Sequence, residues 1–368
     1  MSTKLLNMST LIRNIHLEDP APMRFPRLLS LLLVAGLVAC SGPAGSGGSG
    51  GAGEQVTLRL GYFPNVTHAT AIVGVERGIF AEKLGSGVAL TTQTFNAGGD
   101  VVEAIFNGGL DASYIGPNPA INAWAQSEGE AIRIISGATS GGAFLVVSPD
   151  ITSPDQLAGK RLGSPQLGNT QDVALRAWLL EQGFETDQEG GGDVSVLPQA
   201  NADILTAFSV GELDGAWVPE PWATRMIEEG GGHVLVDERD LWPDGNYVTT
   251  HLIVATTFLD EHPDVVKNLL AGQVAANEYV NENPDESQQA VTNAIAQLTG
   301  SELDPAILAT AWENLEFTCD PIASSLAESA AHAEELGLLD PVDLDGIYDL
   351  TLLNEVVSAE GMEQIPQP

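Results

Sequence analysis

The stretch Asp100-Val-Val-Glu-Ala-Ile-Phe-Asn-Gly-Gly-Leu-Asp-Ala-Ser-Tyr-Ile115 occurs again, in altered form, as Asp203-Ile-Leu-Thr-Ala-Phe-Ser-Val-Gly-Glu-Leu-Asp-Gly-Ala-Trp-Val218. Each copy has the apolar spacing of a short helix, then a glycine that stops it, then a short buried strand. Each strand leads into a Pro-x-Pro loop, Pro117-Asn118-Pro119 or Pro219-Glu220-Pro221. The repeat therefore predicts two lobes built on the same helix–strand plan.

A second pair of matching segments lies upstream. Arg59-Leu60-Gly61 and Arg161-Leu162-Gly163 each end a strand-like run, and each is followed by a polar loop and an amphipathic helix, expected over 68–80 and 170–182. Because strands and helices alternate, we predict an α/β protein with mostly parallel sheets. Ligands bind beyond the carboxyl ends of the strands in such sheets, so the loops of both lobes should face one cleft.

The lobe boundaries are predicted from two further apolar strands. Ala143–Val147 precedes Ser-Pro-Asp, and Tyr247–Val254 follows the turn Pro-Asp-Gly. We interpret these as hinge strands around an inserted second lobe at 148–246. The first lobe then comprises 55–147 and 247–368, and the helical segments after residue 258 should pack on it.

The chain is strongly acidic. Its 368 residues include 50 Asp and Glu against 14 Lys and Arg, a formal net charge of −36. Such a surface repels nucleic acid, so we expect no nucleic-acid partner and interpret the charge as surface hydration. A carboxylate-lined cation site is the alternative, but no compact Asp/Glu motif supports it. A metal site from His68, Glu220 and His251 lacks ligand spacing as well, and we expect neither a metal nor a cofactor.

The N-terminal segment reads as an export signal. Residues 23–39 combine a basic start, an apolar run too short to span a membrane, and small residues before Cys40. The ending Leu-Val-Ala-Cys40 resembles the bacterial lipobox, which predicts lipidation of Cys40 and anchoring to the membrane. The Gly/Ser-rich remainder of 40–54 reads as a flexible tether. Residues 1–22 do not fit a signal, and we interpret them as a misassigned extension before a start at Met23.

Five segments carry a family resemblance. They are Gly61-Tyr62, Gly78-Ile79-Phe80, Asn96-Ala97-Gly98-Gly99, Gly108-Gly109-Leu110-Asp111 and Pro219-Glu220-Pro221-Trp222. In this order, over about residues 55–285, they resemble the nitrate/sulfonate/taurine type of periplasmic binding protein, most closely its aliphatic-sulfonate binders.

The resemblance implies the type II periplasmic-binding-protein fold, with two lobes joined by two hinge strands, and service to an ABC permease. It implies a monomeric carrier of a small anion outside the cytoplasm. Members of the family also bind nitrate, taurine, bicarbonate or thiamin-precursor pyrimidines, so the fold does not identify the ligand.

The candidate ligand-binding residues lie in the loops that lead into helices. They are Tyr62, Asn65, His68, Gly98, Gly99, Asn118, Ser140, Gln166, Gly168, Asn169, Thr170, Gln171, Glu220 and Trp222. Helix N-termini offer free N–H groups and a positive dipole end to an anion, and the loop ending at Thr170 is the first choice. An ordinary N-cap is its alternative interpretation. Glu220 could accept from a ligand ammonium or amide group, close the lobes through a hydrogen bond, or be solvated. Tyr62, Phe63 and Trp222 could wall an alkyl group or belong to the core.

The rival classes are an enzyme and a surface adhesin or signalling subunit. One family of thiamin-pyrimidine synthases shares this architecture and uses a cysteine-rich iron motif and a cofactor-bearing lysine. After Cys40 this chain has only Cys319, and the exported part has only Lys83, Lys160 and Lys267. No nucleophile elbow, P-loop or dinucleotide fingerprint is present. We therefore expect a binding protein and not an enzyme.

Overall fold

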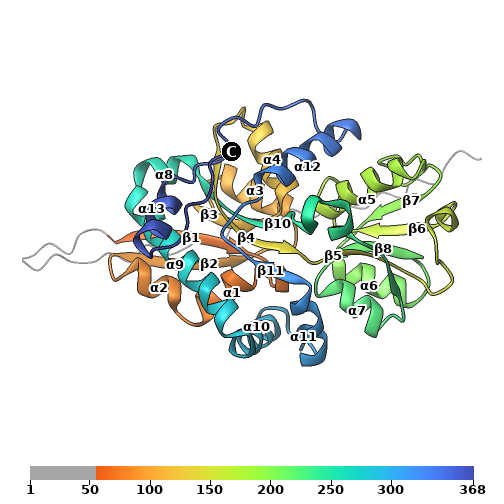
Figure 1. Ribbon diagram of the computed structural model, residues 1–368, viewed down its shortest axis with the longest axis horizontal. Helices are drawn as coiled ribbons and strands as arrows, with labels where there is room; N and C mark the ends of the chain where they lie inside the picture. The colour runs from red at the N-terminus through yellow and green to blue at the C-terminus, as the bar shows by residue number, and fades with distance from the viewer. Residues whose placement is uncertain (1–54) are drawn as a thin grey trace, which may run out of the picture. The chain divides into compact units, whose positions relative to one another are not determined.

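Two sheets organise the part of the chain that the computed structural model describes, residues 55–368 (Figure 1). The first sheet has the order β11-β4-β10-β3-β1-β2 and the second β7-β6-β8-β5-β9. The strands of the first sheet are β1 (Val56–Tyr62), β2 (Val88–Thr94), β3 (Ala112–Ile115), β4 (Ile132–Gly141), β10 (Val248–Ala255) and β11 (Leu315–Phe317). Those of the second are β5 (Ala143–Val147), β6 (Arg161–Ser164), β7 (Ser195–Pro198), β8 (Gly215–Pro219) and β9 (His233–Asp237).

Helices cover both sheets. They are α1 (Ala69–Glu76), α2 (Ile79–Leu84), α3 (Gly98–Phe106), α4 (Pro117–Gln126), α5 (Thr170–Glu181), α6 (Asn201–Ser209), α7 (Trp222–Glu228), α8 (Thr256–Glu261), α9 (Pro263–Glu282), α10 (Pro284–Thr299), α11 (Pro305–Glu313), α12 (Ala323–Glu335) and α13 (Thr351–Ala359). Short 3-10 helices occur at η1 (Val66–His68), η2 (Pro154–Leu157), η3 (Glu238–Leu241) and η4 (Pro243–Gly245). Both sheets belong to one unit of the chain. Within residues 55–368 no helix has the length and apolar character needed to cross a membrane.

The predicted α/β class is confirmed, but both sheets are mixed and not mostly parallel. Strands β2, β1 and β3 are parallel, as are β7, β6 and β8. The antiparallel pairs are β3–β10, β10–β4 and β4–β11 in the first sheet and β8–β5 and β5–β9 in the second. The chain leaves the first sheet through β4 and returns through β10. Outgoing and returning strands that lie side by side must run in opposite directions.

The change of sheet occurs earlier than the sequence predicted. Strand β5 pairs with β8 along its whole length and with β9 from Phe144 onward, so Ala143–Val147 lies in the second sheet. The transition lies at Gly141 and Gly142, which have φ values of 78° and 74°. A methyl group at Gly142 would lie 2.2 Å from Cδ2 of Leu315. Backbone conformation and close packing therefore both require glycine at this point.

The sequence repeat has a direct structural counterpart. Helices α3 and α6 begin and end at matching positions of the two copies, and β3 and β8 begin at matching positions. The repeated aspartate has the same role in each lobe. Asp111 Oδ2 accepts from the backbone N–H of Arg59 at 2.7 Å, and Asp214 Oδ2 accepts from that of Arg161 at 2.9 Å. Each arginine also pairs with its aspartate. The Gly-x-Leu-Asp segment thus ties neighbouring parallel strands together, at the end of the sheet away from the cleft.

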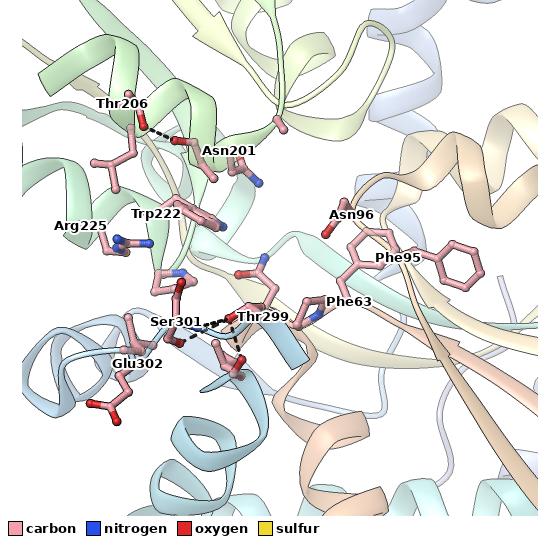
Figure 2. A pocket seen from close by; sticks show the side chains of 18 residues that line it. Phe63, Phe95, Asn96, Asn201, Thr206, Trp222, Arg225, Thr299, Ser301 and Glu302 are labelled. Atoms are coloured by element: carbon pink, nitrogen blue, oxygen red, sulfur yellow. Dashed lines mark hydrogen bonds between the residues drawn. The ribbon is translucent and has the colours of Figure 1, made fainter. Parts of the chain in front are cut away.

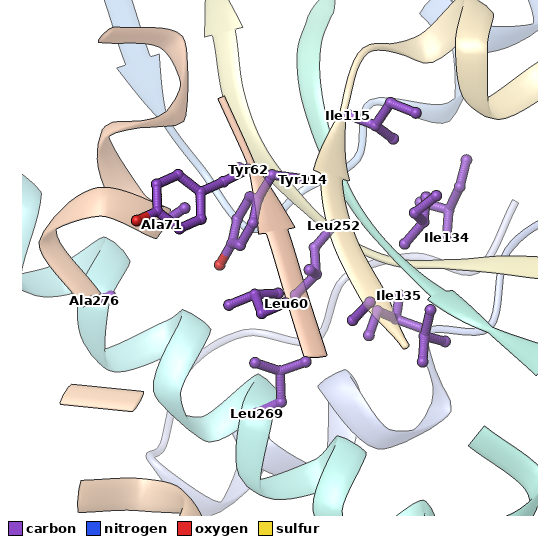
Figure 3. Close-up of a cluster of buried hydrophobic side chains, with 14 of the residues drawn as sticks. Leu60, Tyr62, Ala71, Tyr114, Ile115, Ile134, Ile135, Leu252, Leu269 and Ala276 are labelled. Carbon is purple, nitrogen blue, oxygen red and sulfur yellow. The ribbon is translucent and has the colours of Figure 1, made fainter. Parts of the chain in front are cut away.

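The first lobe contains the larger hydrophobic core. Side chains of the central strands pack against α9, as Leu60, Leu252 and Leu269 illustrate (Figure 3). The second sheet has a smaller core on each face, one around Trp217 and one around Phe208. Helices α9 and α13 join the first core as predicted, but α12 contacts both α4 and α5 and so touches both lobes.

Candidate functional site

A small cavity of about 50 Å³ lies between the lobes, beyond the carboxyl ends of their strands. Its lining consists of Phe63, Asn65, Thr67, His68, Asn96, Gly98, Gly116, Pro119, Pro165, Asn169, Thr170, Gln171, Asn201, Pro219, Thr249 and Thr250. This is the edge at which ligands bind in open α/β sheets. We call it the inner chamber. Of the predicted residues it contains Asn65, His68, Gly98, Asn169, Thr170 and Gln171.

The first residues of three helices line the inner chamber. Helix α3 starts at Gly98, α5 at Thr170 and α6 at Asn201, and none of them receives a side-chain hydrogen bond at its N-cap. The first-turn N–H groups of a helix have no partner within the helix, and the dipole places partial positive charge there. No Asp, Glu, Lys or Arg lines the chamber. The site therefore offers hydrogen-bond donors and positive potential without a countercharge.

His68 is the one titratable residue in the lining. It is 3% exposed, and burial lowers its pKa to about 3. The backbone N–H of Phe63 donates to Nδ1 at 3.3 Å, and the two rings stack with centroids 4.5 Å apart. Because Nδ1 accepts, the proton of the neutral ring lies on Nε2. His68 thus contributes a neutral donor.

The two lobes meet around the chamber through glycines. A methyl group at Gly116 in the first lobe would lie 2.6 Å from Thr170 Oγ1 in the second. One at Gly98 would lie 3.2 Å from Asn169 Oδ1, and one at Gly99 would lie 3.4 Å from Gln166 Nε2. Because these three positions of the first lobe are glycines, polar side chains of the second lobe can approach its backbone. The clamp is closed in this arrangement.

A second, outer chamber of about 480 Å³ adjoins the first and shares Phe63, Asn65, Asn96 and Asn201 with it. Figure 2 shows Trp222 and Arg225 of the second lobe opposite Phe63 and Phe95 of the first. The Arg225 guanidinium lies 4.9 Å from the centre of the Trp222 ring and pairs with Glu229. Aromatic rings thus form part of the wall of the outer chamber, beside polar residues that include Arg225 and Glu302. Trp222 lies there, as expected for a wall residue.

Several predicted site residues lie elsewhere. Tyr62 is buried in the core of the first lobe, because alternation along β1 turns it away from the cleft that Phe63 faces. Asn118 donates from Nδ2 to the carbonyl of Ser329 in α12, 3.2 Å away. Ser140 is buried within β4, which pairs with β10 and β11.

The loop before α5 is held by Asp172 and not by Asn169. Gly168 has a φ of 73°, and its N–H donates to Asp172 Oδ2 at 2.9 Å. The same carboxylate accepts from Ser164 Oγ at 2.5 Å and from Arg176 Nε at 3.1 Å. Gly168 therefore shapes the loop, while the residues after it face the chamber. Gln166 contacts Gly99 but lines neither chamber.

Glu220 of the second lobe is hydrogen-bonded to Asn314 of the first. Its Oε1 accepts from Asn314 Nδ2 at 2.7 Å, and it also binds the N–H and hydroxyl of Thr224. It is 1% exposed, and burial raises its pKa against the opposing effect of these hydrogen bonds. Of the predicted alternatives, the cross-lobe hydrogen bond describes its position. It lines neither chamber.

Sequence reasoning missed part of the lining, notably Gly116, Asn201, Thr249 and Thr250. Asn201 could have been found. The two copies of the repeat are offset by 103 residues, so Asn201 matches Gly98, and both residues begin a helix. Gly116 could not have been found, because its role depends on the opposite lobe. Among residues 55–368, no group of three or more His, Cys, Asp or Glu side chains is placed to hold a metal ion. His251 is buried against the carbonyl of Pro321, 3.0 Å from Nε2.

A pair of α/β lobes that closes over a cleft at the carboxyl ends of its strands defines the class of two-domain periplasmic binding proteins. Within that class the chain belongs to the NMT1-like family, which it matches over residues 51–296. The predicted family resemblance is confirmed.

Curated relatives are identical to this chain at about a quarter of the aligned positions. A binding protein of Brucella abortus (strain 2308) is 27% identical over 237 residues, 64% of this chain and 70% of its own. The taurine-binding periplasmic protein of Escherichia coli (strain K12) is 27% identical over 200 residues, 54% of this chain and 60% of its own.

Solved structures confirm the fold. A ligand-binding component of an ABC-type import system from Staphylococcus aureus, with zinc bound, has a TM-score of 0.68 and 18% identity, covering 82% of this chain and 99% of its own. The alkanesulfonate-binding protein SsuA from Xanthomonas axonopodis pv. citri, bound to MOPS, has a TM-score of 0.63 and 18% identity, covering 82% and 98%.

Proposed function

We propose that this protein is the extracytoplasmic solute-binding component of an ABC importer and that it captures a small organic anion, an aliphatic sulfonate. The observation that carries the proposal is the inner chamber. Three uncapped helix N-termini meet there without one charged side chain, in a chain with a net charge of −36. Exclusion of carboxylates from this one cavity is what an anion requires.

The two chambers together favour an anion with an organic tail. The inner chamber, about 50 Å³, is suited to a headgroup, and the outer chamber, about 480 Å³, adds aromatic surface beside it. Nitrate or bicarbonate would leave the outer chamber without a role. Relatives named for taurine and alkanesulfonate are consistent with a sulfonate headgroup. A thiamin-precursor pyrimidine is a weaker candidate, because it lacks the negative charge that the helix termini favour.

The proposal includes the export route. The signal at 23–39, the lipidated Cys40 and the tether to residue 54 lie outside the described residues. They would hold the binding domain at the outer face of the membrane, where an ABC permease could receive the ligand.

The first prediction tests the inner chamber by calorimetric titration with ethanesulfonate, taurine, nitrate and bicarbonate. Thr170→Val keeps the shape of the side chain but removes a hydroxyl that lines the chamber. Loss of one hydrogen bond to a charged ligand costs about 1.5–3 kcal/mol, so ethanesulfonate should bind about ten- to a hundredfold more weakly. Asn118→Ala is the matched control, because its amide faces Ser329, and it should bind normally. Equal affinities for all three proteins would contradict the proposed site.

A further inference from the structure

A separate cavity of about 590 Å³ lies on another part of the lobe boundary. It shares no lining residue with the inner or outer chamber. Its walls come from α5, from the η3–η4 segment and from α12, which also packs on α4 of the first lobe. The lining residues are Ala174, Ala177, Trp178, Glu181, Glu238, Leu241, Trp242, Pro243, Asp244, Asn246, Ile322, Ser324, Ser325, Glu328 and His332.

The chemistry of this cavity is the reverse of the inner chamber. Four carboxylic acids line it, at Glu181, Glu238, Asp244 and Glu328, and no Lys or Arg does. Two indole rings, Trp178 and Trp242, form part of the wall. Trp242 is held in place by stacking on Tyr247, with ring centres 5.6 Å apart and planes 15° apart. Aromatic rings beside carboxylates are the surroundings that bind ammonium groups.

Glu238 is the buried acidic group of this cavity, and a bound cation would favour its ionised form. Its side chain is buried, with 2% exposure, and accepts from Trp217 Nε1 at 2.6 Å and Trp242 Nε1 at 3.4 Å. Among residues 55–368 it forms no ion pair, and the adjacent Arg239 binds Asp237 instead. Buried carboxylates are normally paired with a cation. Here the cavity beside the carboxylate leaves room for one.

We propose that this cavity binds a small organic cation, an ammonium compound held by Glu238 and the rings of Trp178 and Trp242. The inference is independent of the proposed anion site. Because the walls belong to α5 of the second lobe and to α12, which contacts both lobes, an occupant would also hold the clamp closed.

Calorimetric titration of the whole binding domain with choline tests the proposal, in about 0.15 M salt to screen the acidic surface. Its neutral carbon isostere, 3,3-dimethylbutan-1-ol, has the same shape without the charge. Choline should bind at least about tenfold more tightly than the isostere. Glu238→Gln retains an acceptor for Trp217 and should weaken choline binding at least about tenfold, which corresponds to about 1.4 kcal/mol of binding free energy.

Two further variants guard the test. The side chain of Glu328 is 62% exposed, so the Glu328→Gln variant should fold normally. Its affinity for choline should fall about two- to threefold. Glu335→Gln on the same helix, outside the cavity, is the matched control and should have no effect. Three results would overturn the proposal: no choline binding up to about 10 mM, equal binding of the neutral isostere, or an equal loss in Glu335→Gln. The last result would assign the effect to bulk surface charge.

Discussion

The buried carboxyl groups of this acidic chain are stabilised in different ways. Asp111 and Asp172 each pair with an arginine. Glu220 accepts hydrogen bonds from Asn314 and Thr224. Glu238 accepts hydrogen bonds only from the two indole N–H groups. Its pKa is raised to about 7, mainly by burial and to a smaller extent by the charge of Asp237. Burial thus favours the neutral form of Glu238 relative to an exposed glutamate.

A prediction at the residue scale follows for stability against pH. The unfolded pKa of a glutamate is about 4.5 and the folded pKa of Glu238 is about 7, so the native state keeps this proton over that interval. The stabilisation from proton binding is fully present below about pH 4.5 and is lost as the pH rises through 7. The loss should approach about 3 kcal/mol, at about 1.4 kcal/mol per pKa unit.

Urea denaturation of the wild type and Glu238→Gln at about pH 5 and about pH 8 measures this loss. The variant should gain stability relative to the wild type as the pH rises, since its amide does not ionise. A constant difference between the two proteins at both pH values would show that Glu238 does not titrate in this range.

At the scale of elements, the repeated Arg–Asp pair fixes β1 to β3 and β6 to β8 in the same way. The two pairs differ in exposure. The side chain of Asp111 is 5% exposed, while that of Asp214 is 22% exposed and also lies 3.7 Å from Lys160. Ion pairs contribute less as water screens them. One sequence motif therefore provides two tests of the same contact in different surroundings.

Asp111→Asn should destabilise the protein more than Asp214→Asn. Removal of the charge from the buried acceptor should cost about 1.5–3 kcal/mol, and removal from the more exposed one less than about 1 kcal/mol. Urea unfolding monitored by circular dichroism gives both values. If Asp214→Asn is as damaging as Asp111→Asn, exposure does not set the strength of this contact.

The elements differ in how far the sequence could predict them. The repeat located α3, β3, α6 and β8 because its helix, glycine and strand are encoded locally. The boundary between the lobes, at the end of β4, was not predicted, because the apolar segment Ala143–Val147 would suit either sheet. Only its pairing with β8 and β9 assigns it to the second sheet. Asn118 was assigned to the site by analogy with its loop, whereas the position of α12, set by tertiary packing, gives its amide a partner.

At the scale of the whole molecule, the binding cleft depends on glycines that face the opposite lobe. Gly116 has φ −72° and ψ 162°, a conformation that alanine adopts without strain. The close neighbour of a methyl group there is Thr170 Oγ1, at 2.6 Å. Since Thr170 belongs to the second lobe, the added group should disturb the closed clamp and leave each lobe unaffected.

Gly116→Ala should therefore reduce affinity for ethanesulfonate at least about tenfold, while the ligand-free protein keeps its melting temperature or gains slightly from the stiffer unfolded chain. X-ray scattering should show that ethanesulfonate reduces the radius of gyration of the wild type and leaves that of the variant unchanged. Gly99→Ala is the control, because its methyl group would meet the mobile end of Gln166 at 3.4 Å, an acceptable contact. Combining Gly116→Ala with Thr170→Ala removes the obstructing oxygen and should restore the ligand-induced compaction. If Gly116→Ala closes and binds as the wild type does, the lobes do not need to meet at Gly116 and Thr170 to hold the ligand.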